Sequence, residues 1–361
     1  MRRRPTVVLG ASGLVGQRMQ QRLYNHPWFE LKAIGGRQEH SGSTLEHVPW
    51  RLDELRPAFS SVSVFDLSSD SFVNDLLNLE IEVAFSCLPS DVAERVEHKL
   101  AKAGIAVFSN ASFNRGKEGI PLVVPEINAE HLTAFSTTIG PIGCGTNCTL
   151  IPLAVPLAAL RAFGIQTVRM RSEQALSGAG WQLLFDEEAN NGLLNSEIPG
   201  EAEKIAEEFI HVFGKQDGMK VNSADIQLEI QCQRVPRRDG HQVFVEATFA
   251  QPLSLNSVLQ HLKSYQFPKE LMRCPSAPHH PLHVVEQIDV EQHLWSNGIA
   301  FANQPNPSED LQTGMAVVVG DVKIINESTL SFSAYSHNTI RGAAGGTMLL
   351  AEQAVVEGRI P

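Results

Sequence analysis

The sequence has few cysteines, and their number and spacing argue against two kinds of site. Five cysteines among 361 residues form an odd, sparse set, which speaks against a disulfide framework and indicates a reducing compartment. Cys144 and Cys148 lie four residues apart, but no second close pair and no tightly spaced histidines accompany them. Because a zinc site normally needs such partners, we expect no metal. Packing and nucleophilic roles stay open for both thiols.

Long apolar runs and concentrated positive charge are also missing. No run of about 18 apolar residues exists to cross a bilayer, and the run after "MRRRP" is too short for a secretory leader. The formal net charge is −11, with no basic cluster beyond residues 2–4 and the short segment "RVPRRDGH". Nucleic-acid binding needs a concentrated positive surface. The sequence therefore predicts a cytoplasmic protein that binds neither membranes nor nucleic acids.

The pattern of apolar residues changes near residue 148. Before it, short apolar runs alternate with amphipathic stretches, which predicts a parallel sheet covered by helices on both faces. The strands expected there are 6–10, 31–36, 62–67, 83–88, 105–110 and 137–142, with helices at 14–24 and 90–103. After it, we expect a mostly antiparallel α+β domain. Its expected helices are 149–163, 200–214 and 255–265, and its expected strands are 166–176, 225–236, 240–250, 314–326 and 329–338.

Gly10, Gly13 and Gly16 lie between a predicted strand and a predicted helix. This spacing lets the backbone approach a pyrophosphate at a helix N-terminus, where free N–H groups and the helix dipole stabilise anions. An ordinary tight turn is the alternative, but the strand and helix on either side favour a dinucleotide. The other residues expected to contact the cofactor here are Ser12, Leu14 and Val15.

The end of the second predicted strand bears on the choice between NAD and NADP. NAD-binding units place a carboxylate there for the ribose 2′-hydroxyl. This chain has Arg37 at that point, with Ser41 nearby and Glu39 two residues further on. An arginine suits a 2′-phosphate, so we predict NADP in preference to NAD.

These features predict an α/β fold with two domains. Residues 1–147 form a Rossmann-like, NADP-binding domain, completed by a C-terminal helix in 338–361. Residues 148–337 form an α+β catalytic and dimerisation domain. Its apolar strand residues would expose too much surface in a monomer, so we expect a homodimer or homotetramer.

At the level of motifs, the chain resembles the aspartate-semialdehyde dehydrogenases, and most closely their archaeal and fungal branch. The resemblance covers nearly the whole chain and rests on ordered motifs: "GASGLVG", "FSCLPSDVAE", "VFSNASFNR", "PLVVPEIN", "NCT", "EQALSGAGW", "GEAEK", "RVPRRDGH", "CPSAP" and "SHNTIRGAAGG". It implies the reversible conversion of L-aspartyl 4-phosphate and NADPH into L-aspartate 4-semialdehyde, NADP and phosphate, in the biosynthesis of lysine, threonine and methionine.

The resemblance assigns the nucleophile to Cys148, which attacks the acyl phosphate to give a thioester. Its position at the start of a predicted helix would lower the pKa of the thiol and favour the thiolate. Cys144 matches no nucleophile position and is interpreted as structural. His241 matches the family's acid/base, and Gln174 matches the glutamine that orients the substrate.

Four further residues match the family's substrate-binding positions. Arg234 would bind the substrate α-carboxylate. It lies seven residues before His241, and on one strand an odd interval would face the two side chains oppositely. The turn at 236–240 must therefore reverse the chain to bring both into one pocket. Glu201 and Lys204 share one helix face. Composition alone favours a solvated pair, whereas the resemblance assigns Glu201 to the substrate ammonium and Lys204 to the phosphate. Arg115 would complete the phosphate site.

Asn147, which directly precedes the nucleophile, would complete the phosphate site together with Arg115. The segment "SGAG" at 177–180 matches a glycine turn against the nicotinamide, which makes Ser177 and Gly178 cofactor residues. Asn338, just before the C-terminal helix, would touch the cofactor, so this helix is expected to pack on the first domain.

The chain departs from the family in two places near the site and leaves two other functions open. Gly145 and Thr146 replace a common Asn-Pro pair, and Trp181 stands where tyrosine is usual. One alternative function is a reductase of an acyl-CoA such as malonyl-CoA, which would not need Glu201. The other is a catalytically silent NADP-binding protein, against which the intact nucleophile and histidine argue.

Overall fold

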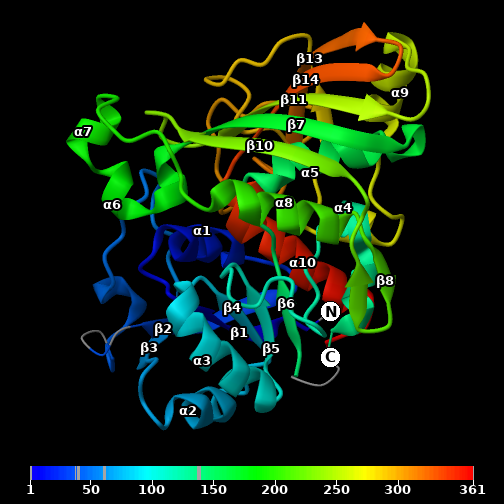
Figure 1. Cartoon of the computed structure of the whole chain (residues 1–361). Helices are drawn as coiled ribbons and strands as arrows, with labels where there is room; N and C mark the ends of the chain where they lie inside the picture. Colours follow the sequence, from blue (N-terminus) through cyan, green and yellow to red (C-terminus); the bar gives the residue numbers. More distant parts are fainter. Residues whose placement is uncertain (1, 37, 39–40, 60–61, 136–139, 361) are drawn as a thin grey trace.

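The structure is a computed structural model that describes residues 2–36, 38, 41–59, 62–135 and 140–360. Within these residues the chain forms two six-stranded sheets and a short two-stranded one. The two large sheets lie in separate layers, with helices α1, α5, α8 and α10 between them (Figure 1). No helix in this part of the chain combines the length and apolar character needed to cross a bilayer.

The first sheet is parallel throughout, in the order β3-β2-β1-β4-β5-β6. Its strands are β1 (Arg4–Leu9), β2 (Phe29–Gly36), β3 (Ser63–Asp66), β4 (Val83–Ser86), β5 (Ala106–Ser109) and β6 (Ile142–Cys144). The strand order reverses on either side of β1, and in such sheets ligands bind beyond the carboxyl ends of the strands at that point. The last strand begins at Ile142, later than the expected strand at 137–142, of which residues 137–139 lie outside the described residues.

Helices cover both faces of this sheet, which is why its strands are nearly continuous apolar runs. One face packs on α2 (Phe72–Asn78) and α3 (Ser90–Lys102). The other face packs on α1 (Leu14–Leu23) and α10 (Gly345–Val356), with Met19, Phe85 and Met348 in one cluster. A helix from the end of the chain therefore completes the layer that the N-terminal segment begins (Figure 1).

The second sheet is mixed, in the order β10-β7-β11-β14-β13-β12. Its strands are β7 (Ile165–Gln174), β10 (Gln227–Arg234), β11 (His241–Phe249), β12 (Leu282–Val284), β13 (Val317–Asn326) and β14 (Thr329–Ser336). The inner pairs are antiparallel and the two edge pairs are parallel. Consecutive strands β10 and β11 lie on opposite sides of β7, so the turn at 236–240 reverses the chain by crossing the end of β7.

Helices α5 (Leu150–Ala159), α8 (Glu201–Val212) and α9 (Leu255–Ser264) pack on one face of the second sheet. The opposite face carries Arg169, Arg171, Phe244 and Glu246 and is hollowed by a depression of about 710 Å³. The remaining short elements are α4 (Pro125–Asn128), α6 (Trp181–Leu184), α7 (Glu187–Asn190), β8 (Lys215–Asp217) and β9 (Lys220–Asn222).

Candidate active site

The turn after β1 brings its backbone unusually close to neighbouring chain. Gly10 has a φ of +75°, and a Cβ on it would lie 2.7 Å from the carbonyl oxygen of Cys87. A Cβ on Gly16 would collide with the carbonyl oxygen of Gly10. Only glycine satisfies these two positions, because the first needs a left-handed backbone and the second needs direct contact between helix and turn. This is the geometry that a pyrophosphate-binding turn requires.

A cleft of about 1000 Å³ opens beside this turn. Its walls come from the turn itself, the end of β2, the segments 48–51, 64–68 and 87–92, and the second domain. The predicted cofactor residues among its lining are Gly10, Ser12, Gly13, Leu14, Val15, Ser177 and Gly178. Ser41 is exposed and is not part of the lining, and Arg37 lies outside the described residues. The cleft has the size and the glycine cradle that a dinucleotide needs.

Arg51 contributes a positive charge to the cleft that no sequence motif indicated. A buried side chain of α1, Gln17, holds the segment that carries it. Gln17 Nε2 donates to the Pro49 carbonyl at 2.8 Å, and its Oε1 accepts from the Arg51 backbone N–H at 2.9 Å. The 49–51 segment is thereby fixed against the start of the helix that follows the glycine turn.

Trp181, noted above as a departure from the family, connects the two domains at this cleft. Its indole Nε1 donates to the carbonyl of Ser12 at 2.9 Å. Leu184, the last residue of the helix that it begins, clusters with Leu176 and with Leu14, the first residue of α1. The wall that carries Ser177 and Gly178 is therefore attached directly to the phosphate-binding turn.

Cys148 lies half-buried two residues before α5, against the segment that leads into the C-terminal helix. A Cβ on Gly342 would lie 2.7 Å from the Cys148 Cβ, so only glycine allows this packing. Burial, followed by the negative charge of Glu201, raises the pKa of the Cys148 thiol to about 11, although Arg115 and Arg234 act in the opposite direction. The expectation that the helix start favours the thiolate is therefore wrong for this structure.

Arg234 and His241 meet around one residue of the cleft wall. A Cβ on Gly178 would lie 2.9 Å from Arg234 Nη1 and 3.0 Å from His241 Nε2. Ala175 holds both side chains: its carbonyl accepts from Arg234 Nη1 at 2.8 Å, and its N–H donates to His241 Nδ1 at 3.1 Å. The turn that crosses β7 thus brings the two residues together, as expected from the sequence.

The hydrogen bond from Ala175 defines what His241 can do. Because Nδ1 accepts, Nε2 carries the proton in the neutral ring. Nε2 is buried and has no hydrogen-bond partner among the described residues. Burial, then the charges of Arg234 and Arg237, holds the pKa of His241 well below its usual range. The ring therefore presents a neutral N–H donor at the site.

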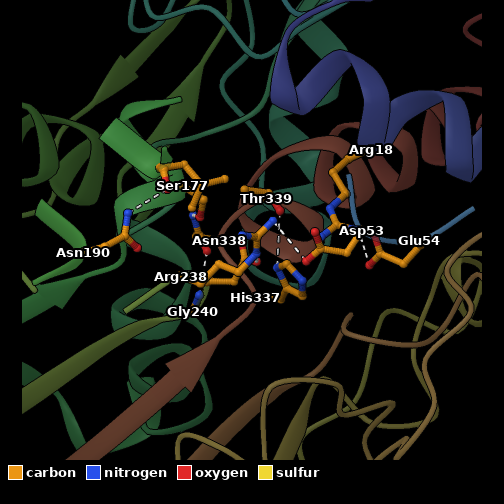
Figure 2. A network of polar contacts seen from close by, with 12 residues as sticks. Arg18, Asp53, Glu54, Ser177, Asn190, Arg238, Gly240, His337, Asn338 and Thr339 are labelled. Atoms are coloured by element: carbon orange, nitrogen blue, oxygen red, sulfur yellow. Dashed lines mark hydrogen bonds and ion pairs between the residues drawn. The ribbon is translucent and has the colours of Figure 1, made fainter. Parts of the chain in front are cut away.

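Asn338 is buried behind the cleft wall and does not reach the lining. Its Nδ2 donates to Ser177 Oγ at 2.8 Å, and its Oδ1 accepts from the Gly240 N–H at 2.7 Å. Figure 2 shows Asn338 between these two residues. On the same turn, Arg238 forms an ion pair of 3.1 Å with Asp53 of the first domain. The turn that leads into His241 is thus held from two sides.

The predicted substrate residues surround the start of α5. Asn147 Nδ2 donates to Glu201 Oε1 at 2.9 Å, and Arg115 Nη1 forms an ion pair of 2.9 Å with Glu208. Glu208, which no sequence motif indicated, shares its helix face with Glu201 at a spacing of seven residues. This spacing is visible in the sequence, but a second glutamate on a helix normally indicates a solvated face.

The other predicted residues differ in their surroundings. Gln174 is buried at the end of β7, where its Nε2 donates to Ser172 Oγ at 3.4 Å. Lys204 is exposed on α8. Cys144 is fully buried in β6, and burial raises the pKa of its thiol far above the usual range. Such an inert thiol is suited to packing and not to nucleophilic attack.

Comparisons with known proteins give the chain a family. The family profile described as "Semialdehyde dehydrogenase, NAD binding domain" matches residues 6–135. An aspartate-semialdehyde dehydrogenase of Archaeoglobus fulgidus is 35% identical, over 97% of this chain and 97% of the relative. A malonyl-CoA reductase (NADP) of Metallosphaera sedula is 28% identical, over 98% of this chain and 97% of the relative.

The fold agrees with this relationship. The crystal structure of aspartate-semialdehyde dehydrogenase with NADP from Candida albicans superposes with a TM-score of 0.80 and 29% identity, covering 99% of this chain and 100% of the other. The match above 30% identity covers 97% of the chain, and the structural superposition covers 99% of it. The chain belongs to the aspartate-semialdehyde dehydrogenase family.

Proposed function

We propose that this chain catalyses the reversible, NADP-dependent reductive dephosphorylation of L-aspartyl 4-phosphate to L-aspartate 4-semialdehyde. The observation that carries this proposal is the meeting of Arg234 and His241 against Gly178, a residue of the wall of the dinucleotide cleft. The proposed carboxylate-binding group and the proposed proton donor thus adjoin the wall of this cleft. Cys148 would supply the thiol, and the effect of the Arg234 charge on its pKa supports a position near the same pocket.

NADP, when bound, supplies or accepts the hydride. The glycine turn, the 49–51 segment with Arg51 and the 177–181 wall with Trp181 would hold it, because these line the cleft. The related enzyme from Candida albicans was crystallised with NADP, which supports the same cofactor here.

The substrate would be held by charge at three points. Arg234 would bind the α-carboxylate, Glu201 the α-ammonium, and Arg115 with Asn147 and Lys204 the phosphate. Cys148 would release its proton to solvent, and its thiolate would attack the acyl carbon; the C–O bond to phosphate would then break, and a thioester would form on the sulfur. After reduction of the carbonyl carbon, the C–S bond would break and release the aldehyde. Gln174 would orient the carbonyl during these steps.

His241 would act as a hydrogen-bond donor. Its Nε2 proton stabilises negative charge on the substrate oxygen during attack and during collapse. A neutral ring held by Ala175 cannot take the thiol proton without forming an imidazolium ion, which the two nearby arginines oppose. This is narrower than the acid/base role that the family resemblance implies.

We further propose residues 1–147 with the helix in 338–361 as the NADP-binding domain, and 148–337 as the catalytic and dimerisation domain. The packing of α10 on the first sheet supports the first assignment. The uncovered face of the second sheet, with its half-buried Phe244, supports assembly into a dimer or tetramer through that face. All five cysteines are free thiols, which fits a reducing compartment such as the cytoplasm.

The activity is tested by following NADPH formation from aspartate semialdehyde, NADP and phosphate, beside NADPH oxidation with malonyl-CoA. We expect the first reaction and not the second, because an acyl-CoA has no ammonium group for Glu201. Cys148→Ala should abolish turnover and leave NADP binding unchanged. His241→Asn should lower kcat by about 10²- to 10³-fold, the usual effect of removing one hydrogen-bond donor to a developing oxyanion. Activity with malonyl-CoA alone would contradict the proposal.

A further inference from the structure

Glu208 is a buried carboxylate that no step described so far uses. It lies on α8 with 7% of its surface exposed. Carboxylates are almost never buried to this extent unless both oxygens are paired. Its Oε1 accepts from Arg115 Nη1 at 2.9 Å, and its Oε2 accepts from the backbone N–H of Asn147 at 2.6 Å. One side chain therefore contacts two parts of the proposed phosphate site.

The first contact fixes the guanidinium of Arg115. A second bond, from Arg115 Nη2 to the Asn110 carbonyl at 2.7 Å, restrains the same group from the other side. Arg115 Nη1 and Nη2 each carry a second N–H beyond these two bonds, and 13% of the side chain is exposed. The guanidinium is thus held at two nitrogens and keeps donor capacity for an anion, which is the arrangement that a phosphate-binding arginine needs.

The second contact fixes the residue before the nucleophile. With its N–H bound to Glu208, Asn147 accepts from the Thr149 N–H at 2.8 Å through its side-chain oxygen. These two bonds restrain the backbone on both sides of Cys148. Glu208 therefore joins the loop that carries the sulfur to the arginine assigned to the leaving group.

We propose that Glu208 is a positioning residue that aligns Arg115 with the Cys148 loop, so that the phosphate is held beside the acyl carbon that the sulfur attacks. The inference rests on the proposed function, which assigns the phosphate to Arg115. Glu208 does not reach the substrate in this proposal and acts through its two partners. Its loss should weaken phosphate binding and leave the NADP cleft unchanged, since Glu208 is not among the residues that line that cleft.

The test compares Glu208→Gln with Glu207→Gln in the direction that consumes phosphate. Glu207 is the preceding residue on the same helix and is exposed, so it controls for the loss of one negative charge. In Glu208→Gln, we expect the KM for phosphate to rise about 10- to 100-fold, the usual effect of losing a charge-assisted hydrogen bond. The KM for NADP and the Tm should stay close to those of Glu207→Gln.

A double-mutant cycle separates positioning from simple stabilisation. In an Arg115→Ala background, Glu208→Gln should raise the KM for phosphate little further, because Arg115, the partner through which Glu208 acts on the phosphate, is gone. Additive effects would overturn the proposal, as would a KM for phosphate equal to that of Glu207→Gln. A parallel rise of both KM values with a lower Tm would also overturn it, because that pattern indicates a structural role. If the unmodified chain forms no NADPH, the proposed function fails, and this inference with it.

Discussion

Burial and neighbouring charges, and not residue type alone, set the ionisation states of the residues in the site. Cys148 is the clearest case, because the pKa of its thiol is raised to about 11 by burial and by Glu201. A substrate ammonium group paired with Glu201 would offset that negative charge. Binding of an amino-acid substrate would thereby favour the thiolate at the moment when attack is possible. A substrate without an ammonium group would lack this effect, which gives Glu201 a part in specificity.

This ionisation predicts how Cys148 reacts with iodoacetamide in the absence of substrate. A raised pKa means that the thiol is protonated at pH 7, so the thiolate fraction and the inactivation rate should rise about tenfold per pH unit towards pH 10. Glu201→Gln should accelerate inactivation at a given pH by up to about 10-fold, the effect of one pKa unit. Cys144→Ala should leave the rate unchanged. A plateau near pH 8.5, the ordinary cysteine value, would contradict the prediction.

At the scale of elements, the site depends on short segments that are attached to the large sheets. The 176–184 segment forms one wall of the cofactor cleft, and Trp181 attaches it to the glycine turn through Ser12. The ring of Trp181 also stacks on Phe185, with a centroid distance of 5.7 Å. The wall is therefore attached to the turn, and NADP would contact both.

Trp181→Phe should weaken NADP binding by about 2- to 10-fold, because it removes a hydrogen bond worth about 0.5–1.5 kcal/mol and keeps the aromatic ring. Phe185→Leu is the matched comparison, since it removes the stacked partner without touching the bond to Ser12. NADP titration monitored by tryptophan fluorescence or by calorimetry measures both. An equal loss in the two variants would show that packing, and not the bond to Ser12, holds the wall.

At the scale of the whole molecule, the two sheets differ in how they are covered. Helices lie on both faces of the first sheet but on one face of the second. The uncovered face carries charged side chains around Phe244, and the Arg171 guanidinium lies 4.3 Å from the ring centroid of Phe244. Extended sheet faces of this kind pair between subunits when their surfaces are complementary.

Phe244→Asp should shift the protein towards monomer in light scattering at equal concentration, because it places a charge at the centre of the proposed interface. Leu77→Asp is the control: Leu77 is 43% exposed and lies on α2, which packs on the first sheet. This control should keep the mass of the unmodified protein. A monomer mass for the unmodified protein at all concentrations would exclude assembly through this face.

Much of the fold could be predicted because its signals are local. Apolar runs placed β1, β2, β4 and β5 within about two residues of their observed bounds, since a strand covered on both faces must be apolar along its length. The glycine turn was predictable for the same reason, because backbone conformation and close contact restrict those positions to glycine. The bounds of β6 were not, because a three-residue strand beside glycine and proline carries too short a pattern.

The sequence by itself determined the elements, the cofactor turn and, through its ordered motifs, the family and the candidate nucleophile. The tertiary structure alone decided the contacts between residues far apart in the chain. Trp181 bonds to Ser12 across the domains, Glu208 joins Arg115 to the nucleophile loop, and burial raises the pKa of Cys148. The reason is physical: hydrogen bonds and desolvation depend on which groups meet in space, and a local pattern does not specify the partner.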